Sequence, residues 1–158
     1  MKISCDGEPK ASLEKGLFVL IGVKKTDGEA VARQMAQKLV NLRIIPDEND
    51  KLNLSVTDPK AGADLLAVSN FTLYADCASS RRPGFPDSAS FDEGKKIYDL
   101  FIGYLRLALA DAEKSGGRAV KLATGVFGAH MEITYTAVGP VTVILDSDQP
   151  GMIKAQNG

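Results

Sequence analysis

The sequence predicts an α+β domain with mostly antiparallel sheets, or a partial barrel, and two helices packed on one side. Short apolar runs come in hairpin-like pairs, and two longer segments with helical periodicity lie between them. This mixture is typical of the α+β class, in which helices cover one side of a sheet. The chain has 158 residues, enough for one domain with a substantial core. We expect that domain over residues 1–147 and a polar tail over residues 148–158.

The strands are predicted from short runs rich in β-branched and other apolar residues. The run GLFVLIGV is continuously apolar, which indicates a strand buried on both faces. A Gly-Pro pair at 139–140 separates the last two runs, and a turn between two strands is its simplest interpretation. The complete set of expected strands is 2–5, 16–23, 52–56, 64–74, 119–124, 131–136 and 141–146.

Both helices are predicted from a capping box followed by apolar residues at helical spacing. The boxes are Thr26 with Glu29 and Ser90 with Glu93. The first helix should end near residue 42, and the second should end before the glycine pair at 116–117. The expected apolar stripes are Val31, Met35, Leu39 and Leu42 in the first helix and Ile97, Leu100, Phe101, Tyr104, Leu105 and Ala108 in the second.

Charge and cysteine content limit the partners and the compartment. Lysine and arginine total 19 and aspartate and glutamate total 20, so the net charge is −1 and a nucleic-acid partner would need a local basic patch. Cys5 and Cys77 have no CxxC spacing, which favours two reduced thiols in a cytoplasmic protein. No apolar run is long enough to cross a bilayer and no secretory leader is recognisable, so we expect no membrane partner.

The single histidine, His130, restricts the chemistry further. A metal site with several histidines is excluded, and a Ser-His-Asp triad could use only this one imidazole. The sequence has no GxSxG elbow to present a serine, and it has no GxxxxGK[ST] or GxGxxG loop. We therefore expect neither a metal nor a cofactor.

Polar residues interrupt a strongly apolar strand in the stretch LLAVSNFTLYAD, at Ser69, Asn70 and Thr72. The commoner explanation is that Asn70 and Thr72 satisfy backbone groups at the end of the strand. The functional alternative is a hydrogen-bonding wall for a polar ligand, with Phe71 and Leu73 anchored in the core. The residues alone favour the first explanation.

Two further stretches could contact a ligand. Phe127 lies between two glycines in TGVFGAHM, where an aromatic ring is either part of the core or a platform that stacks a base. Arg81 and Arg82 lie in a loop at 75–90 rich in glycine, proline and small residues, where they are either solvated or bind phosphate in two-point fashion. His130 alone is more often a surface or capped histidine than a catalyst.

Four stretches together resemble the D-aminoacyl-tRNA deacylases in order and spacing: 38–56, 69–85, 125–131 and 138–147. The family hallmarks are a Ser-Gln-Phe-Thr-Leu motif and an Asn-x-Gly-Pro-Val-Thr motif, which appear here as SNFTL and AVGPVT. The similarity covers nearly the whole chain, from about residue 2 to residue 147.

The resemblance implies a homodimer that hydrolyses the ester joining a D-amino acid, or glycine, to the 3′ end of tRNA, with no metal or cofactor. It implies a catalytic segment formed by Ser69, Asn70, Phe71 and Thr72. It also implies a cis Gly139–Pro140 bond that reaches into the partner subunit's pocket. The substrate-binding residues would be Phe127, Gly128, Ala129, Met131, Gly139, Pro140, Val141 and Thr142, with Arg81 and Arg82 on the phosphates.

The sequence departs from the family pattern at two positions and at its start. Asn70 stands where the family has Gln, and Ala137 stands where it has Asn. The family also has a strand upstream of the segment that matches 2–8, so we expect an open sheet edge where that strand would pair. Two other functions therefore stay open: a non-catalytic nucleic-acid-binding homologue and a hydrolase of small esters.

Overall fold

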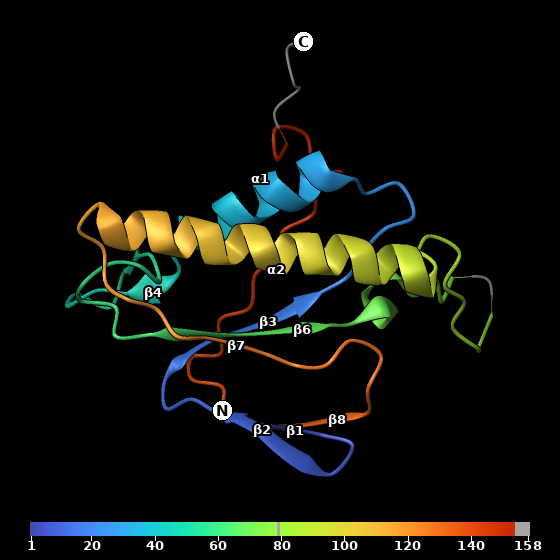
Figure 1. The fold of residues 1–158 in the computed structure, drawn as a ribbon, viewed down its shortest axis with the longest axis horizontal. Helices are drawn as coiled ribbons and strands as arrows, with labels where there is room; N and C mark the ends of the chain where they lie inside the picture. Colours follow the sequence, from blue (N-terminus) through green and yellow to red (C-terminus); the bar gives the residue numbers. More distant parts are fainter. Residues whose placement is uncertain (79, 154–158) are drawn as a thin grey trace.

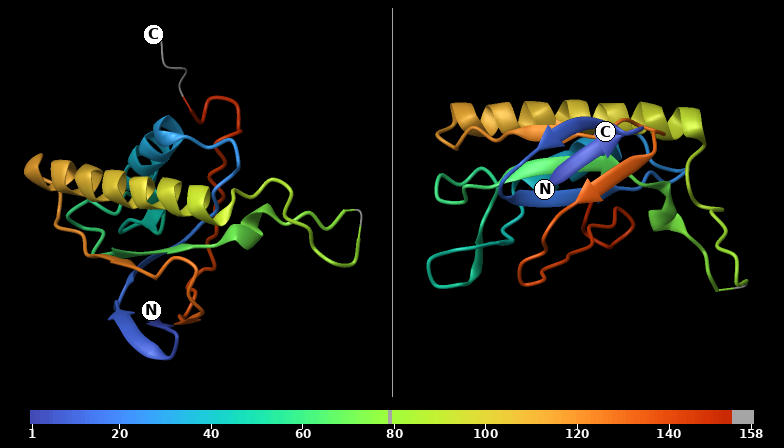
Figure 2. Two further views of the ribbon diagram at one scale, coloured as in Figure 1. Left: turned by 45° about the vertical axis from the view of Figure 1, so that its right-hand side comes forward. Right: turned by 90° about the horizontal axis from the view of Figure 1, so that it is seen from below.

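Two helices cover one face of a parallel sheet, and a small antiparallel sheet lies against the other face (Figures 1 and 2). The structure is a computed structural model that describes residues 1–78 and 80–153. The helices are α1 (Glu29–Val40), α2 (Phe91–Lys114) and the 3-10 helix η1 (Phe71–Tyr74). The strands are β1 (Lys2–Cys5), β2 (Glu8–Ser12), β3 (Gly16–Ile21), β4 (Ile45–Pro46), β5 (Leu52–Leu54), β6 (Asp64–Ser69), β7 (Leu122–Thr124) and β8 (Met131–Thr134). The α+β class and the placement of both helices on one side are confirmed.

The sheet under the helices has the order β3-β6-β7 and is parallel throughout. Its middle strand, β6, is buried from Leu65 to Val68, which suits the continuously apolar sequence of that strand. The edge strand β3 is only partly buried, and its Leu20 is 42% exposed, so the expectation of burial on both faces is wrong for β3. Antiparallel pairing holds in the sheet β2-β1-β8 and in the β4-β5 pair.

Several expected strands are shorter, and one is absent. The predicted strand at 64–74 ends at Ser69, where the chain turns into η1. The predicted strand at 141–146 is not formed, because no described strand lies beside it to complete a ladder. Conversely, β2, which follows a turn at Asp6–Gly7, was not among the predicted strands.

The predicted capping boxes are not formed as expected. The N-cap of α1 is Gly28, with no side-chain cap, and Glu29 instead accepts a hydrogen bond from the Tyr104 hydroxyl of α2. Ser90 is the N-cap of α2, but its hydroxyl donates to the Glu93 carboxylate at 3.0 Å and caps no backbone amide.

Within the described residues, no helix has both the length and the apolarity that a bilayer span requires.

Each helix buries a face rotated slightly from the predicted stripe. In α2, Phe101 and Leu105 are buried as expected, while Leu100 and Tyr104 are only partly buried. The residues that α2 buries are Gly94, Tyr98, Phe101, Ile102, Leu105 and Leu109, and those that α1 buries are Ala32, Ala36, Leu39 and Val40. One core lies between the helices and the parallel sheet, and a second lies between the two larger sheets.

Candidate active site

The carboxyl ends of β3, β6 and β7 meet at one edge of the parallel sheet, because all three strands run in the same direction. The Asn70 amide donates to the Ile21 carbonyl at 2.8 Å, and the Gly125 amide donates to the Ala67 carbonyl at 3.3 Å. This edge therefore brings together the two stretches that the sequence singled out, at 69–72 and 125–128. Ligand sites on parallel sheets form at such edges.

The Asn70 side chain organises the end of β6. Its Oδ1 atom accepts a hydrogen bond from the Thr72 amide at 3.0 Å and another from the Thr72 hydroxyl at 2.5 Å. These bonds make Asn70 the N-cap of η1. The local-structure explanation thus holds for Asn70, whereas the Thr72 hydroxyl bonds to the Asn70 side chain and not to a backbone group. Ser69 is partly buried at the last position of the strand.

The expectation that Phe71 and Leu73 are anchored in the core is wrong. Their exposed fractions are 60% and 53%. The strand ends at Ser69, and η1 exposes both side chains. The Phe71 ring packs edge-on against Phe85, with centroids 4.9 Å apart. Sequence analysis did not single out Phe85, although it follows the Arg-Arg-Pro-Gly stretch as an isolated aromatic in a polar loop.

Phe127 is partly buried between two other rings. Its centroid lies 5.2 Å from that of Phe91 and 5.5 Å from that of Tyr98. It also lines a depression of about 360 Å³ between α2 and the chain after β7. Gly128 has a φ of +77°, and a Cβ there would lie 2.7 Å from the Phe91 ring, so the motif needs glycine at this position. Phe127 thus belongs to the core and also has a face available to a ligand.

The rest of this motif is structural in the single chain. Ala129 and Met131 are partly buried in the core between the two larger sheets. His130 is exposed, and its hydrogen bonds to the described residues are made by its backbone: its amide donates to an Asp6 carboxylate oxygen at 3.1 Å and its carbonyl accepts from the Asp6 amide at 2.9 Å. The imidazole has no role in the arrangement at the sheet edge.

The Gly139–Pro140 bond is cis, which confirms the prediction. Gly139 has a φ of +117°, and neither this pair nor Val141 and Thr142 hydrogen-bonds to any other described residue. Val138 and Ile144, on either side, are 86% and 82% exposed. The single chain therefore does not bring 139–142 into hydrogen-bonding contact with 69–72 or 125–131.

Arg81 and Arg82 lie in the 75–90 loop, which projects from the body of the molecule beyond the start of α2 (Figures 1 and 2). Both are exposed, and neither makes an ion pair with any residue that the structure describes. Residue 79, in the same loop, lies outside the described residues. The two guanidinium groups are therefore accessible to a ligand.

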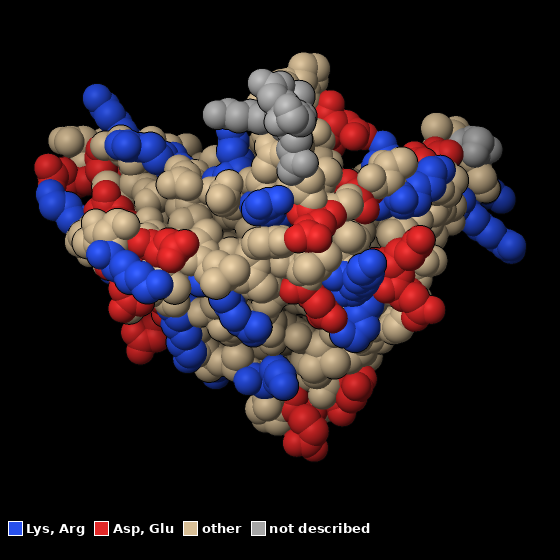
Figure 3. Space-filling view, turned by 45° about the horizontal axis from the view of Figure 1, so that its top comes forward, with Lys and Arg blue, Asp and Glu red and all other residues tan. Residues whose placement is uncertain are grey.

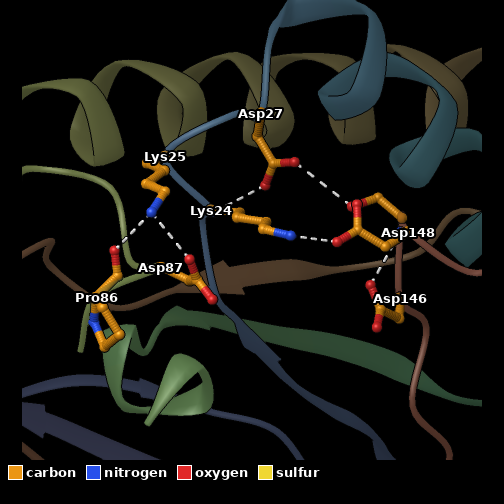
Figure 4. Close-up of polar contacts among 8 residues, drawn as sticks. Lys24, Lys25, Asp27, Pro86, Asp87, Asp146 and Asp148 are labelled. Carbon is orange, nitrogen blue, oxygen red and sulfur yellow. Dashed lines mark hydrogen bonds and ion pairs between the residues drawn. The ribbon is translucent and has the colours of Figure 1, made fainter. Parts of the chain in front are cut away.

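A C-terminal clasp, formed by Lys24, Asp27, Ser147 and Asp148, ties the chain after β8 to the loop after β3 (Figure 4). Lys24 forms an ion pair with Asp148, and the Ser147 hydroxyl approaches an Asp27 carboxylate oxygen at 3.5 Å. The other Asp27 oxygen accepts the Lys24 amide at 2.8 Å. The clasp thus holds the start of the polar tail against the body of the protein. Residues 154–158 of the tail lie outside the described residues.

The clasp places carboxylates near Tyr74 of η1. Burial, reinforced by the nearby charges of Asp27, Asp146 and Asp148, raises the pKa of the Tyr74 hydroxyl to about 12. Tyr74 therefore keeps its proton and is not a general base near neutral pH. Burial also raises the pKa of Asp27, against its hydrogen bonds from Lys24 and Ser147. In the described parts of the chain, no three histidine, cysteine or acidic side chains are grouped so that they could hold a metal ion.

These features define the class of protein: a small α+β protein whose candidate site, at a sheet edge, combines main-chain amides, short polar side chains and aromatic rings. The chain belongs to the D-Tyr-tRNA(Tyr) deacylase family, whose model matches residues 1–146. It is 41% identical over 146 residues to the D-aminoacyl-tRNA deacylase of Thermosipho africanus, covering 92% of this chain and 90% of that one. It is 40% identical over 148 residues to the protein of that name from Clostridioides difficile, covering 94% and 91%.

Two solved structures superpose on this chain. A c-Myc DNA unwinding element binding protein superposes with a TM-score of 0.74 at 28% identity, over 90% of this chain and 89% of that chain. A probable eukaryotic D-amino acid tRNA deacylase superposes with a TM-score of 0.55 at 15% identity, over 83% and 86%, which supports the fold alone. The family recognised from the sequence motifs is confirmed.

Proposed function

We propose that this chain hydrolyses the ester bond of D-aminoacyl-tRNA, and of mischarged glycyl-tRNA, as a chirality-proofreading step of translation in the cytoplasm. Membership of the deacylase family over residues 1–146 carries the proposal. Relatives named D-aminoacyl-tRNA deacylase match along almost the whole chain, and the SNFTL and AVGPVT stretches lie inside the matched region.

The end of β6 supplies a donor for the ester oxyanion. The amides of Asn70 and Thr72 are already engaged, by the Ile21 carbonyl and the Asn70 side chain. Within the described chain the Phe71 amide donates to no other group. We assign this N–H to the developing oxyanion, where one well-placed donor accelerates such reactions by about 10²-fold or more.

Thr72 positions the substrate in this proposal. Its hydroxyl proton is donated to Asn70 at 2.5 Å, and the only imidazole of the chain, that of His130, lies in a different motif. A hydroxyl without an adjacent base is a weak nucleophile. The water that attacks the ester is then activated by the substrate itself, through the terminal 2′-OH of the tRNA, as the family resemblance implies.

The terminal adenine stacks on the accessible face of Phe127 in this proposal, over the depression between α2 and the chain after β7. Gly128, Ala129 and Met131 shape the neighbouring wall. Arg81 and Arg82, exposed in the projecting loop, bind tRNA phosphates in two-point fashion.

The 137–144 segment joins two copies of the chain into a homodimer in this proposal. Val138 and Ile144 are largely exposed, and Val141 and Val143 are 48% and 46% exposed. Contiguous exposed apolar side chains with unpaired backbone mark an interaction site. Gly139–Pro140 would then enter the partner subunit's pocket with Val141 and Thr142, where main-chain carbonyls exclude an L side chain and bind the substrate amino group.

A nucleic-acid-binding homologue without catalytic activity is the second candidate. The structural relative named as a c-Myc DNA unwinding element binding protein favours it, as do Asn70 and Ala137 in place of the family's Gln and Asn. A hydrolase of small esters on the same scaffold is the third candidate. The near-neutral net charge of −1 gives no support to general nucleic-acid binding.

One experiment separates these functions. Purified protein is incubated with D- and L-aminoacyl-tRNA pairs and with a free D-amino-acid ester, and loss of each ester is followed. The proposal requires rapid loss of the D-aminoacyl-tRNA ester only. Binding of tRNA without ester loss would establish the second candidate, and turnover of the free ester would establish the third.

A further inference from the structure

The loop between β3 and α1 contacts three separate parts of the chain. One of them is η1: a Cβ atom at Gly22 would lie 3.1 Å from the Leu73 Cβ atom and 3.1 Å from the Tyr74 ring. The loop therefore packs closely against the proposed catalytic segment. Its adjacent lysines, Lys24 and Lys25, contact the other two parts, and Figure 4 shows their side chains extending to opposite sides of the loop.

Lys24 attaches the far end of the segment that carries Gly139–Pro140. Its ammonium forms the ion pair with Asp148 in the C-terminal clasp. The hydrogen bond with Asp148 raises the pKa of Lys24, against partial burial, so the ammonium stays charged. From residue 136 to residue 145 the chain makes no hydrogen bond or ion pair with any other described residue. Polar contacts therefore hold this segment at two places, the β8–β1 ladder and the C-terminal clasp.

Lys25 attaches the 75–90 loop at the end that follows its two arginines. The Lys25 ammonium donates to the Pro86 carbonyl at 3.0 Å and forms an ion pair with Asp87 at 3.0 Å. The Lys25 amide also donates to the Asp87 carbonyl at 3.0 Å. The side chain of Lys25 is 53% exposed, against 22% for Lys24, so water screens this ion pair more strongly than the one in the clasp.

We propose that Lys24 and Lys25 are positioning residues for two different parts of the proposed reaction, on which this inference rests. Lys24 fixes the position of Gly139–Pro140 and thereby supports discrimination against L-aminoacyl-tRNA. Lys25 fixes the 75–90 loop and thereby supports tRNA binding by its two arginines. A segment that is tied at one end samples more conformations than a segment tied at both ends. Loss of either attachment should therefore weaken the function of that segment alone.

The charge distribution makes the position of the arginine pair important. On the face shown in Figure 3, basic side chains are interspersed with acidic side chains and with uncharged surface. Arg81 and Arg82 form no ion pair with a described residue. A phosphate backbone is attracted by clustered positive charge, so its affinity depends on where accessible cations such as these two arginines are held.

Nitroxide labels test both attachments without requiring catalysis. Ile144→Cys in a Cys77→Ser background carries a label on the Gly-Pro segment, at a position that is 82% exposed. The exposed Cys77 of the otherwise unchanged chain carries a label on the 75–90 loop, while Cys5 is buried and protected from labelling. Electron paramagnetic resonance spectra then report the nanosecond mobility of each segment.

Lys24→Met should increase the mobility of the label at residue 144 and leave the label at Cys77 unchanged, and Lys25→Met should do the reverse. Lys24→Arg should match the wild type at both positions, because it keeps the charge. Lys10→Met, on exposed β2, loses the same charge and should change neither label. Circular dichroism verifies folding. A response of both labels to one lysine variant, or of neither, would overturn the proposal.

Two activity measurements should separate in the same way. Lys24→Met should lower the ratio of kcat/KM for D over L substrates about five-fold, with tRNA affinity unchanged, because the segment loses one of its two attachments. Lys25→Met should weaken tRNA binding by only about three-fold, since water screens its ion pair, and should leave the D-to-L ratio unchanged. A general loss of structure would change both quantities in both variants and would overturn the proposal.

A double-mutant cycle tests the Lys24 contact itself. Asp148→Asn should reproduce Lys24→Met, and the variant with both substitutions should be no worse than either alone, because both remove the same contact. Additive effects would overturn the proposal. A wild-type protein without ester loss from D-aminoacyl-tRNA, but with the expected label responses, would refute the proposed function and leave both attachments established. Deacylase activity with unresponsive labels would refute this inference alone.

Discussion

The Asn70 Oδ1 atom accepts two hydrogen bonds from Thr72, one from the backbone amide at 3.0 Å and one from the hydroxyl at 2.5 Å. The pair starts η1 and turns the chain away from the sheet directly after Ser69. It also occupies the Thr72 amide, while the Phe71 amide has no acceptor among the described residues. The two residues thus determine which main-chain donor faces the proposed substrate.

Thr72→Ala should lower deacylation by less than about ten-fold. The hydrogen bond from the Thr72 backbone amide to the Asn70 side chain does not depend on the Thr72 hydroxyl. The substitution should therefore leave this bond and the position of the Phe71 amide unchanged. Thr72→Ser, which retains the hydroxyl, should be close to wild type. Single-turnover ester hydrolysis on D-aminoacyl-tRNA measures both. Complete loss of turnover in a folded Thr72→Ala protein would transfer the nucleophile role to the hydroxyl.

Gly139→Ala should relax discrimination against L-aminoacyl-tRNA by about ten-fold and lower turnover of the D substrate. The φ of +117° disfavours any side chain, and the new Cβ would lie 3.1 Å from the Val141 amide nitrogen, so the segment must change shape. The ratio of kcat/KM for D and L substrates measures the effect. Gly151→Ala, which also has a positive φ but no atom nearby, is the control and should leave this ratio unchanged.

Ile144→Asp should abolish assembly through the 137–144 segment and reduce deacylation in parallel. The side chain is 82% exposed in the single chain, so the folded subunit should lose little stability. A charge placed in a desolvated contact opposes association strongly. Sedimentation velocity measures assembly and urea unfolding measures stability. An unchanged mass with unchanged activity would refute the proposed dimer.

Replacement of Arg81 and Arg82 by alanine should weaken tRNA binding and flatten its salt dependence. Each lost phosphate contact removes about 0.7–0.9 from the slope of log affinity against log salt concentration. Discrimination between D and L substrates should not change, because phosphate contacts position the substrate without reading its stereochemistry. The control is Lys38→Ala/Lys51→Ala. If the arginine variant keeps the wild-type affinity and slope, the phosphates must contact lysines such as Lys95 and Lys96.

Asp27 and Asp47 should give pH dependences of opposite sign. Burial raises the pKa of Asp27 above 3.8, so its contribution to stability is full below pH 3.8 and is lost as the pH rises through the raised pKa. Hydrogen bonds from the Asn49 amide and the Asn53 side chain lower the pKa of Asp47, so its contribution is present above pH 3.8 and is lost as the pH falls through the lowered pKa.

The free energy of unfolding of the wild type, of Asp27→Asn and of Asp47→Asn, measured from pH 2.5 to 7, checks both signs. The wild-type advantage over Asp27→Asn should shrink as the pH rises, and the advantage over Asp47→Asn should grow. Parallel differences for the two variants would contradict the assignment.

The sequence by itself determined the family, the α+β class and both long helices, and the family resemblance implied the cis Gly139–Pro140 bond. Each of these depends on local signals or on motifs with a fixed order: apolar residues at helical spacing specify α2, and the joint order of SNFTL and AVGPVT specifies the family. A strand was also predicted from the strongly apolar run at 64–74, and β6 forms its first part.

Only the tertiary structure decided where the 64–74 segment stops being a strand, and therefore that Phe71 and Leu73 face solvent. The end of β6 depends on the register of β6 beside β3 and on the side-chain cap at Asn70. Neither can be predicted from the two-residue repeat of side chains that is typical of a strand. Contacts between residues distant in the chain could not be predicted from the sequence either, because they depend on how the elements pack. Lys24, after β3, meets Asp148 in the C-terminal tail, and Phe127, after β7, packs on Phe91 at the start of α2; no local sequence pattern links either pair.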